Sequence, residues 1–212
     1  MKIKLLLFLT IFSFCFAYSQ VEVKAGMGIN YLSIPSLYDY INTYYASSSD
    51  QVPTFSSAIN GFIEVDYFLQ KNFSIGLEGV YSFSSFTYFN IGRMEMQYDI
   101  IKASAMAFYV ISGTGYDFKL GGGVGPRFTT AKETFTVESF DYNSVGFGFL
   151  LKTEGNTLLS GNLYANINAS LGYDFLGTPK SGDRYIYNDV VNENVNLNNL
   201  SLGVGLGLTY KF

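Results

Sequence analysis

Histidine is absent from this 212-residue chain, and its one cysteine, Cys15, lies in an apolar stretch near the amino terminus. Imidazole is the side chain best suited to taking a proton near neutral pH, and imidazole and thiolate are typical zinc ligands. Histidine-assisted hydrolysis and histidine- or thiolate-based metal sites are therefore excluded. We expect no catalytic residue, no metal and no cofactor. A carboxylate pair, Glu64 and Asp66, remains open as an acid–base site, although pairing with internal cations is the favoured role for both.

Charged residues are also scarce, at 14%, whereas aromatic residues make up 18% and glycine numbers 22. An ordinary soluble domain carries about 25% charged residues. Beyond the amino-terminal stretch no apolar run reaches about eighteen residues, so helical membrane spans are excluded. Much apolar surface without a spanning helix predicts either a large dry core or a surface that faces lipid. The net charge of −4 argues against nucleic-acid binding, which relies on basic patches.

The amino-terminal stretch has the pattern of a secretory signal peptide. Two lysines precede an apolar run of about twelve residues (5–16), and Ala17 and Ser19 are the small residues that signal peptidase reads. The run is too short for a spanning helix, which needs roughly twenty residues. We predict a cleaved signal peptide over 1–19 and a single domain over 20–212.

Apolar and polar residues alternate along most of that domain. Every second residue from Leu200 to Phe212 is apolar, with Ser, Gly, Thr or Lys between them. A period of two predicts a strand with one apolar face. No position on the apolar face of these segments is charged. Six further segments show the same alternation, over residues 21–31, 61–67, 73–83, 116–126, 145–151 and 159–175.

An eighth segment, over residues 101–111, is less regular. Met106, Phe108 and Val110 fall on its polar face, and Asp99 falls in line with its apolar face. Either a β-bulge or a strand end beyond the bilayer accounts for this pattern. The register of this strand is left open.

The connections between segments alternate in length. Short turns are predicted at 70–72, 112–115 and 154–156, because these stretches are rich in turn-forming residues. Long polar loops are predicted at 32–58, 84–95, 129–143 and 176–199. Eight strands joined in this way have both ends on the short-turn side, as in outer-membrane barrels of Gram-negative bacteria.

A membrane strand cannot leave an open sheet edge in hydrocarbon, so the sheet must close. The predicted fold class is all-β: a closed antiparallel transmembrane up-and-down β-barrel of about eight strands, in the outer membrane with periplasmic termini. A soluble, lipocalin-like barrel with the apolar face turned inward is the alternative. The length of the strands, the small residues on the polar face and the aromatic residues near strand ends favour lipid.

Charged residues of the strands share the face opposite the apolar row. The interior of a barrel of about eight strands is just filled by side chains, so a wide pore is not expected. We predict an internal ion-pair network in the lumen, which Lys102 joins if its strand keeps register. Its other members are Glu22, Lys24, Glu64, Asp66, Glu78, Asp117, Lys119, Arg127, Lys152, Asp174 and Lys211.

The last seven residues, 206–212, resemble the carboxy-terminal targeting motif of outer-membrane barrels, which ends in Phe with an aromatic residue two positions before it. The resemblance implies that Leu208, Tyr210 and Phe212 form the signal read by the outer-membrane assembly machinery. With its Tyr-, Phe- and Asn-rich loops and a signal ending in Ser-Gln, the chain is similar to the outer-membrane β-barrel domain (PorT-like) family of Bacteroidota. It also resembles the small OmpA/OmpX-type barrels. The resemblance implies no particular activity.

Three functions remain, in order of preference. The first is a non-enzymatic outer-membrane barrel with structural, adhesion or partner-binding roles, whose loops 32–58 and 176–199 contact proteins, other cells or lipopolysaccharide. The second is a narrow conduit for small or hydrophobic solutes. The third, a lipid-active enzyme, is disfavoured because histidine is absent. Loop tyrosines support the first, since tyrosine is common at interfaces. These loop residues are Tyr38, Tyr40, Tyr44, Tyr45, Arg184, Tyr185 and Tyr187.

Overall fold

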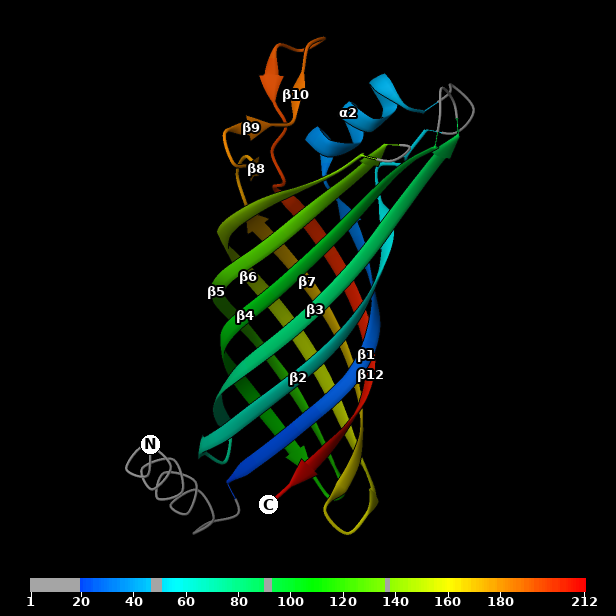
Figure 1. Ribbon diagram of the computed structural model, residues 1–212. Coiled ribbons are helices and arrows are strands. Elements are labelled where there is room, and N and C mark those ends of the chain that lie inside the picture. Colours follow the sequence, from blue (N-terminus) through cyan, green and yellow to red (C-terminus); the bar gives the residue numbers. More distant parts are fainter. Residues whose placement is uncertain (1–19, 47–50, 90–92, 136–137) are drawn as a thin grey trace, which may run out of the picture.

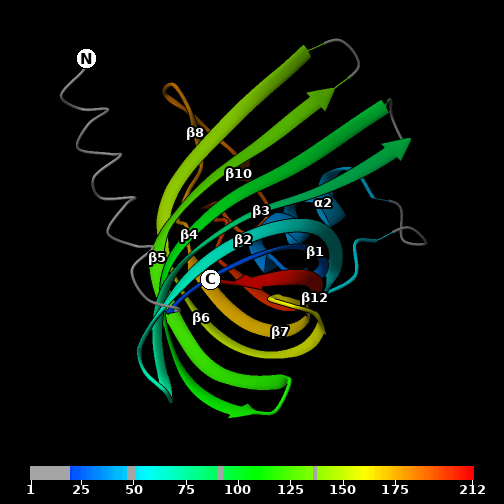
Figure 2. The same cartoon turned by 90° about the horizontal axis from the view of Figure 1, so that it is seen from below.

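Eight long strands form a closed ring in the computed structural model, which describes residues 20–46, 51–89, 93–135 and 138–212. The strands pair antiparallel, and β1 closes the ring by pairing with β12 (Figures 1 and 2). The predicted eight-stranded β-barrel is therefore confirmed, whereas the predicted signal peptide lies outside the described residues. The long strands are β1 (Val21–Ser33), β2 (Ser56–Gln70), β3 (Phe73–Phe89), β4 (Arg93–Gly113), β5 (Tyr116–Phe135), β6 (Glu138–Ser160), β7 (Leu163–Phe175) and β12 (Asn199–Lys211).

The apolar row of each strand faces outward. Leu206 is 67% exposed, and Leu202 and Leu171 are 44% and 43% exposed, while Leu163 is half-buried. A soluble barrel would bury these side chains, so the lipocalin-like alternative is wrong. The outward-facing apolar residues of the eight long strands, which include Leu171, Leu202 and Leu206, are here called the apolar belt. An uncharged surface is what hydrocarbon demands, because a lysine or arginine near the bilayer midplane costs about 2–4 kcal/mol.

Two of the three predicted short turns are confirmed, and the third is wrong. The chain turns between β2 and β3 at 71–72 and between β4 and β5 at 114–115. The predicted turn at 154–156 lies within β6, which continues to Ser160, and the chain turns at 161–162 instead. Gly161 has a φ of +53°, a conformation that glycine adopts without strain.

The predicted loops 84–95 and 129–143 are mostly strand. β3 and β4 form one long hairpin and β5 and β6 another, and both rise beyond the ends of the other four long strands (Figure 1). Their polar composition is typical of loops. Above the apolar belt, however, the alternation is reversed, so that apolar residues point inward and polar residues outward.

The reversal is clearest in β4. Its outward row passes from Ile101 to Asp99 and Gln97, and its inward row from Lys102 to Ile100. The neighbouring outward rows become polar at the same level. β4 keeps one register throughout its pairing with β3, so the bulge is wrong and Asp99 belongs to a strand end beyond the bilayer.

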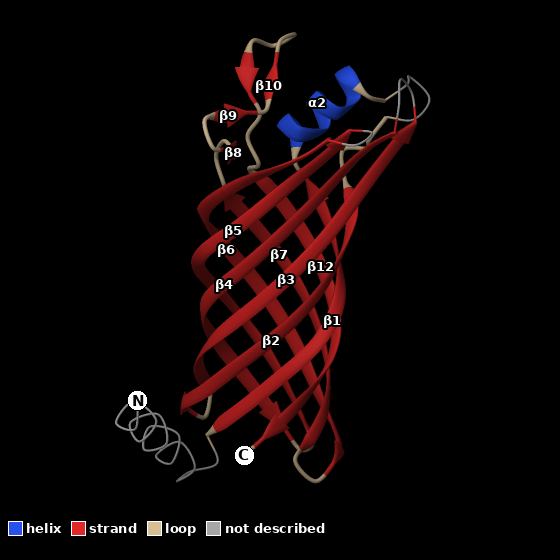
Figure 3. Ribbon diagram, viewed as in Figure 1, coloured by secondary structure: helices blue, strands red, loops and turns tan. Residues whose placement is uncertain are grey.

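A small globular cap, here called the head, sits over this end of the barrel. It comprises the upper ends of β3–β6, the helix α2 and four short strands (Figure 3). Its apolar core includes Ile34, Leu37, Ile41, Met96 and Leu197. Among the described residues, no helix is long and apolar enough to cross a membrane. The elements of the head are α2 (Pro35–Tyr44), β8 (Lys180–Ser181), β9 (Arg184–Tyr185), β10 (Tyr187–Asn188) and β11 (Glu193–Asn194).

Candidate functional site

The structure places all eleven charged residues named from the sequence on the inward side of the strands. All except Lys211 are at most 5% exposed. Period-two alternation explains this placement, since every second residue of a strand enters the interior. Lys102 and Glu154 lie among them, so the described interior below the head holds seven carboxylates and six cations. The carboxylates are those of Glu22, Glu64, Asp66, Glu78, Asp117, Glu154 and Asp174, and the cations belong to Lys24, Lys102, Lys119, Arg127, Lys152 and Lys211.

Lys24 is the centre of the largest cluster. Its Nζ lies 2.8 Å from an oxygen of Asp66 and 3.1 Å from one of Glu22, and it also pairs with Glu64 and Glu154. Every one of these side chains is fully buried. Four carboxylates from three strands thus converge on one ammonium group. Such a charge is retained in the interior only because its partners replace the lost water.

Two more lysines extend this cluster. Lys152 Nζ lies 2.6 Å from both Glu64 and Glu78 and 2.8 Å from Glu154. Lys119 pairs with Glu22 and, at 2.8 Å, with Asp66.

Aromatic rings support the same cations. The ring centroid of Phe108 lies 5.3 Å from the Nζ of Lys24 and 5.5 Å from that of Lys119, and Phe62 lies 5.2 Å from Lys152. These distances suit cation–π attraction. These contacts explain why the apolar side chain of Phe108 points into a charged interior.

Glu154 is the member that sequence reasoning missed. Glu-Gly-Asn is a common turn composition, which hid the strand that continues through it. In the ladder Glu154 lies opposite Lys119 of β5 and Asn168 of β7. The alternation of Lys152 and Glu154 was the available signal, because both share the inward face.

Three of the interior carboxylates lie close enough together to suggest a metal site. Oxygens of Glu64, Asp66 and Glu154 lie within 4.8 Å of one another. The ammonium group of Lys24 contacts all three, so the position that a cation would take holds a lysine. The same contact makes Glu64 and Asp66 partners of Lys24 rather than a free acid–base pair.

A second cluster lies nearer the head. Asp174 accepts hydrogen bonds from the Nζ of Lys102 and the Nε of Arg127, both at 2.7 Å. At the opposite end, Lys211 pairs with Asp117, which also accepts a hydrogen bond from Asn156 at 2.7 Å.

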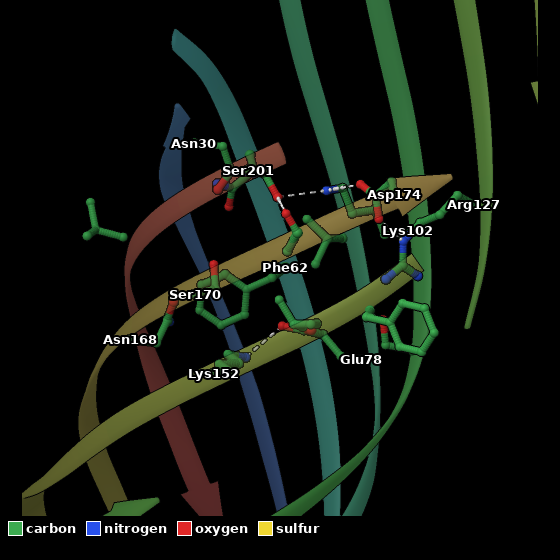
Figure 4. A pocket seen from close by; sticks show the side chains of 17 residues that line it. Asn30, Phe62, Glu78, Lys102, Arg127, Lys152, Asn168, Ser170, Asp174 and Ser201 are labelled. Atoms are coloured by element: carbon green, nitrogen blue, oxygen red, sulfur yellow. Dashed lines mark hydrogen bonds and ion pairs between the residues drawn. The ribbon is translucent and has the colours of Figure 1, made fainter. Parts of the chain in front are cut away.

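A small cavity separates the two main clusters. It has a volume of about 40 Å³, and its polar lining includes Glu78 and Lys152 on one side and Lys102, Arg127 and Asp174 on the other (Figure 4). That is room for a few water molecules. Above it the apolar core of the head closes the barrel. Below it Phe108, which packs with Met106 and Val110, lies against Lys24 and Lys119 of the main cluster. Within the described residues, the interior is filled rather than open.

The helix α2 covers the mouth of the barrel because of its apolar spacing. Ile34, Leu37, Tyr38 and Ile41 recur at helical intervals and are buried, and Pro35 begins the helix, a position that suits proline. No helix was predicted in this loop. The tyrosine-rich composition was interpreted as an exposed surface, but Tyr38 is only 3% exposed.

Two other tyrosines of this loop fix the end of α2 to β5. The hydroxyls of Tyr40 and Tyr45 donate to the buried carboxylate of Glu133 at 3.2 and 3.0 Å. Burial and the nearby charge of Glu133 raise the pKa of Tyr45 to about 12 and that of Tyr40 further. Both hydroxyls therefore keep their protons, and the contact holds, at any ordinary pH.

The two long connections of the head are tied to each other. The backbone amide of Asp189 donates to the hydroxyl of Tyr44 at 2.8 Å, and that of Asn196 donates to Ser36 at 3.1 Å. Residues 176–199 nevertheless keep an exposed face. Tyr185 and Tyr187 are each 43% exposed, and Val190 and Val191 at the hairpin tip are exposed to a larger extent. Arg184 lies over the ring of Phe140.

The carboxy-terminal residues lie on the outer face of β12. Leu208, Tyr210 and Phe212 are exposed there, and the last two rings pack against each other with centroids 4.8 Å apart. The amide of Phe212 donates to the carbonyl of Val21, which ties the end of the chain to β1. Their role as an assembly signal stays a prediction.

Fold and interior together define the class: a small transmembrane β-barrel with a closed, charged interior. Solved structures similar to it include a major outer membrane protein from Thermus thermophilus (TM-score 0.49, 14% identity, 90% of this chain and 99% of that one). Neisserial surface protein A is similar too (TM-score 0.48, 15% identity, 91% and 97%), as is Ail of Yersinia pestis (TM-score 0.46, 13% identity, 91% and 99%).

At these scores the likeness carries no argument about activity. No protein-family model matches the chain, and no curated protein sequence matches it. The comparisons therefore give no support to the PorT-like resemblance.

Proposed function

We propose that this chain is a non-enzymatic outer-membrane protein whose extracellular head acts in adhesion or partner binding. Both ends of the barrel domain lie on the side of the short turns, and the head lies on the other (Figure 1). Outer-membrane barrels have short turns in the periplasm and long connections outside. The proposed signal peptide over 1–19 would deliver the chain to the periplasm, with Leu208, Tyr210 and Phe212 read by the assembly machinery.

The closed interior carries this proposal. Ion pairs fill the barrel within the apolar belt, and a packed apolar core fills its outer mouth. A conduit needs a continuous path, whereas the cavity between the clusters measures about 40 Å³. The head is then the part that contacts the surroundings.

Within the head, residues 176–199 are the proposed contact surface. Exposed Tyr185, Tyr187, Val190 and Val191 supply an apolar and aromatic face of the kind enriched at interfaces. The loop 32–58 supports this surface from within, through α2, and contributes less contact of its own. Proposed partners are another protein, a neighbouring cell or lipopolysaccharide.

The test joins a conductance measurement to a binding measurement. Purified barrel in planar bilayers is expected to show no single-channel current. Cells that display the protein are expected to attach to one another and to lipopolysaccharide-coated sensors, and the double change V190S/V191S is expected to weaken attachment about fivefold or more, the equivalent of about 1 kcal/mol. The matched control is Phe55→Ser, which removes an exposed aromatic residue (38%) outside residues 176–199.

Each result separates the candidate functions. Steady single-channel currents would favour the narrow conduit and reject a closed barrel. Attachment that V190S/V191S leaves unchanged, or that Phe55→Ser weakens equally, would reject residues 176–199 as the contact surface. Comparing the cell and lipopolysaccharide arms identifies the class of partner.

A further inference from the structure

The barrel wall is interrupted at one place between β4 and β5. Their backbone pairing keeps the same register on both sides of the interruption but skips Ala103–Pro126 and Ser104–Gly125. Proline has no amide N–H, so Pro126 cannot donate to the carbonyl of the residue opposite it, Ala103. The interruption is therefore a missing hydrogen bond and not a bulge.

This position lies in the apolar belt. Val124 and Phe128, on either side of Pro126 in the outward row, are 43% and 46% exposed. A backbone carbonyl without a donor is costly in hydrocarbon, where no water can replace the lost bond. Proline in a closed barrel strand therefore requires compensation nearby.

The guanidinium of Arg127 supplies that compensation from inside the barrel. Its Nη1 donates to the carbonyl oxygen of Ala103 at 2.9 Å, and also to those of Pro126 at 3.1 Å and Gly125 at 3.2 Å. Its Nε is bound to Asp174 at 2.7 Å. A guanidinium carries five N–H donors in one plane, so a single side chain serves the backbone and the carboxylate together.

Glycine at position 125 leaves space beside the same carbonyl. A Cβ on Gly125 would lie 2.1 Å from the carbonyl oxygen of Ala103. Only glycine leaves this carbonyl room beside β5. The side chain of Arg127 is 1% exposed and lies beside Lys102 and Asp174 (Figure 4).

We propose that Arg127 is a surrogate backbone donor: it replaces the amide that Pro126 lacks and so completes the β4–β5 wall. Asp174, held in turn by Lys102, positions the guanidinium for this contact. A lysine at 127 would also balance the charge of Asp174. Donating to the carbonyl of Ala103 and to Asp174 at once requires the planar guanidinium with its several N–H groups.

The experiment uses restoration of the missing amide. Arg127→Lys keeps a positive charge beside Asp174 but offers one nitrogen, so we expect the ratio of folded to unfolded protein in lipid vesicles to fall about tenfold. Adding Pro126→Ala returns an N–H opposite Ala103, and the double variant is expected to recover most of that loss. Pro126→Ala alone is expected to change the ratio less than about threefold, because the carbonyl already has a donor.

Asp174→Asn is the control for the ion pair, because it removes the negative charge while the amide oxygen still accepts from the Nε of Arg127 and keeps the guanidinium in place. Pro126→Ala is expected to change the stability of the Asp174→Asn variant by no more than it changes the stability of the native chain. A second readout is the ¹³C carbonyl chemical shift of Ala103 in lipid nanodiscs. Arg127→Lys should move that shift and the double variant should restore a hydrogen-bonded value.

Two outcomes would overturn the proposal. One is an equal effect of Pro126→Ala in the native, Arg127→Lys and Asp174→Asn backgrounds. The other is an Ala103 carbonyl shift that Arg127→Lys leaves unmoved. If Arg127→Lys does not fold, recovery of folding in the double variant supports the proposal, and failure of both variants contradicts it.

Discussion

At the scale of single residues, the described interior below the head holds one more carboxylate than cations, so the two kinds of charge are not equally replaceable. Lys24 is surrounded by four carboxylates, whereas Glu154 is one of several acids around Lys24 and Lys152. Removing one partner of a buried pair costs about 3–5 kcal/mol when the remaining charge is left uncompensated. A lysine lost from this cluster leaves such charges, while a lost glutamate brings the interior closer to balance.

We therefore predict that Lys24→Met lowers the free energy of unfolding in lipid vesicles by about 3–5 kcal/mol. Glu154→Gln is predicted to lower it by less, because Lys24 and Lys152 keep other carboxylates. Urea titration followed by the mobility shift of the folded barrel on gels measures both. Lys71→Met, at an exposed turn, is the control and should change little. Equal losses for Lys24→Met and Glu154→Gln would contradict the charge-balance argument.

At the scale of elements, a strand was predictable wherever one chemical pattern holds along it. In β12, six alternating apolar residues from Leu200 to Tyr210 were sufficient to place the strand. β4 was not predictable in register, because Lys102 and Ile100 share one face while belonging to different surroundings. The inward side is polar within the belt and apolar in the head. The same change hid α2, whose tyrosines suggested exposure although Tyr38 packs in the head.

The contact between α2 and β5 gives a prediction about pH. The pKa of Tyr45 in the folded protein, about 12, lies above its ordinary value near 10. The stabilisation from its protonated hydroxyl is therefore complete below pH 10 and is lost as the pH rises through 12. Glu133→Gln removes one cause of the raised pKa and should shift the tyrosinate absorbance step of Tyr45 to lower pH.

Glu138→Gln, an exposed carboxylate on β6, is the matched control for that titration and should leave the step in place. Tyr45→Phe should remove the step near pH 12. A Tyr45 step that stays unmoved in Glu133→Gln would mean that burial alone, without the carboxylate, holds the hydroxyl of Tyr45 in its protonated form.

At the scale of the whole molecule, a lipid-facing barrel and a water-facing head share the same continuous strands. Within the belt β6 turns Leu151 and Val145 outward to lipid and Lys152 inward. Two residues above Val145, on the same outward row, Asn143 begins the polar face of the head. Hydrocarbon selects apolar outward residues and water selects polar ones. The boundary between the two lies at the same level on β4, β5 and β6, because these strands pair in register. One substitution should therefore have different consequences at two points on a single face.

We predict that Leu151→Arg lowers the free energy of unfolding by about 2–4 kcal/mol, since its side chain, 62% exposed, enters hydrocarbon. Asn143→Arg, eight residues away on the same outward row, should change it by at most about 1 kcal/mol, the value near an interface. Unfolding titrations in vesicles measure both. The gap should also narrow in a thinner bilayer, because Leu151 then lies nearer water while Asn143 is already there. Equal losses at both positions would mean that the hydrocarbon boundary does not lie between them, and that the head, as well as the belt, is embedded in the membrane.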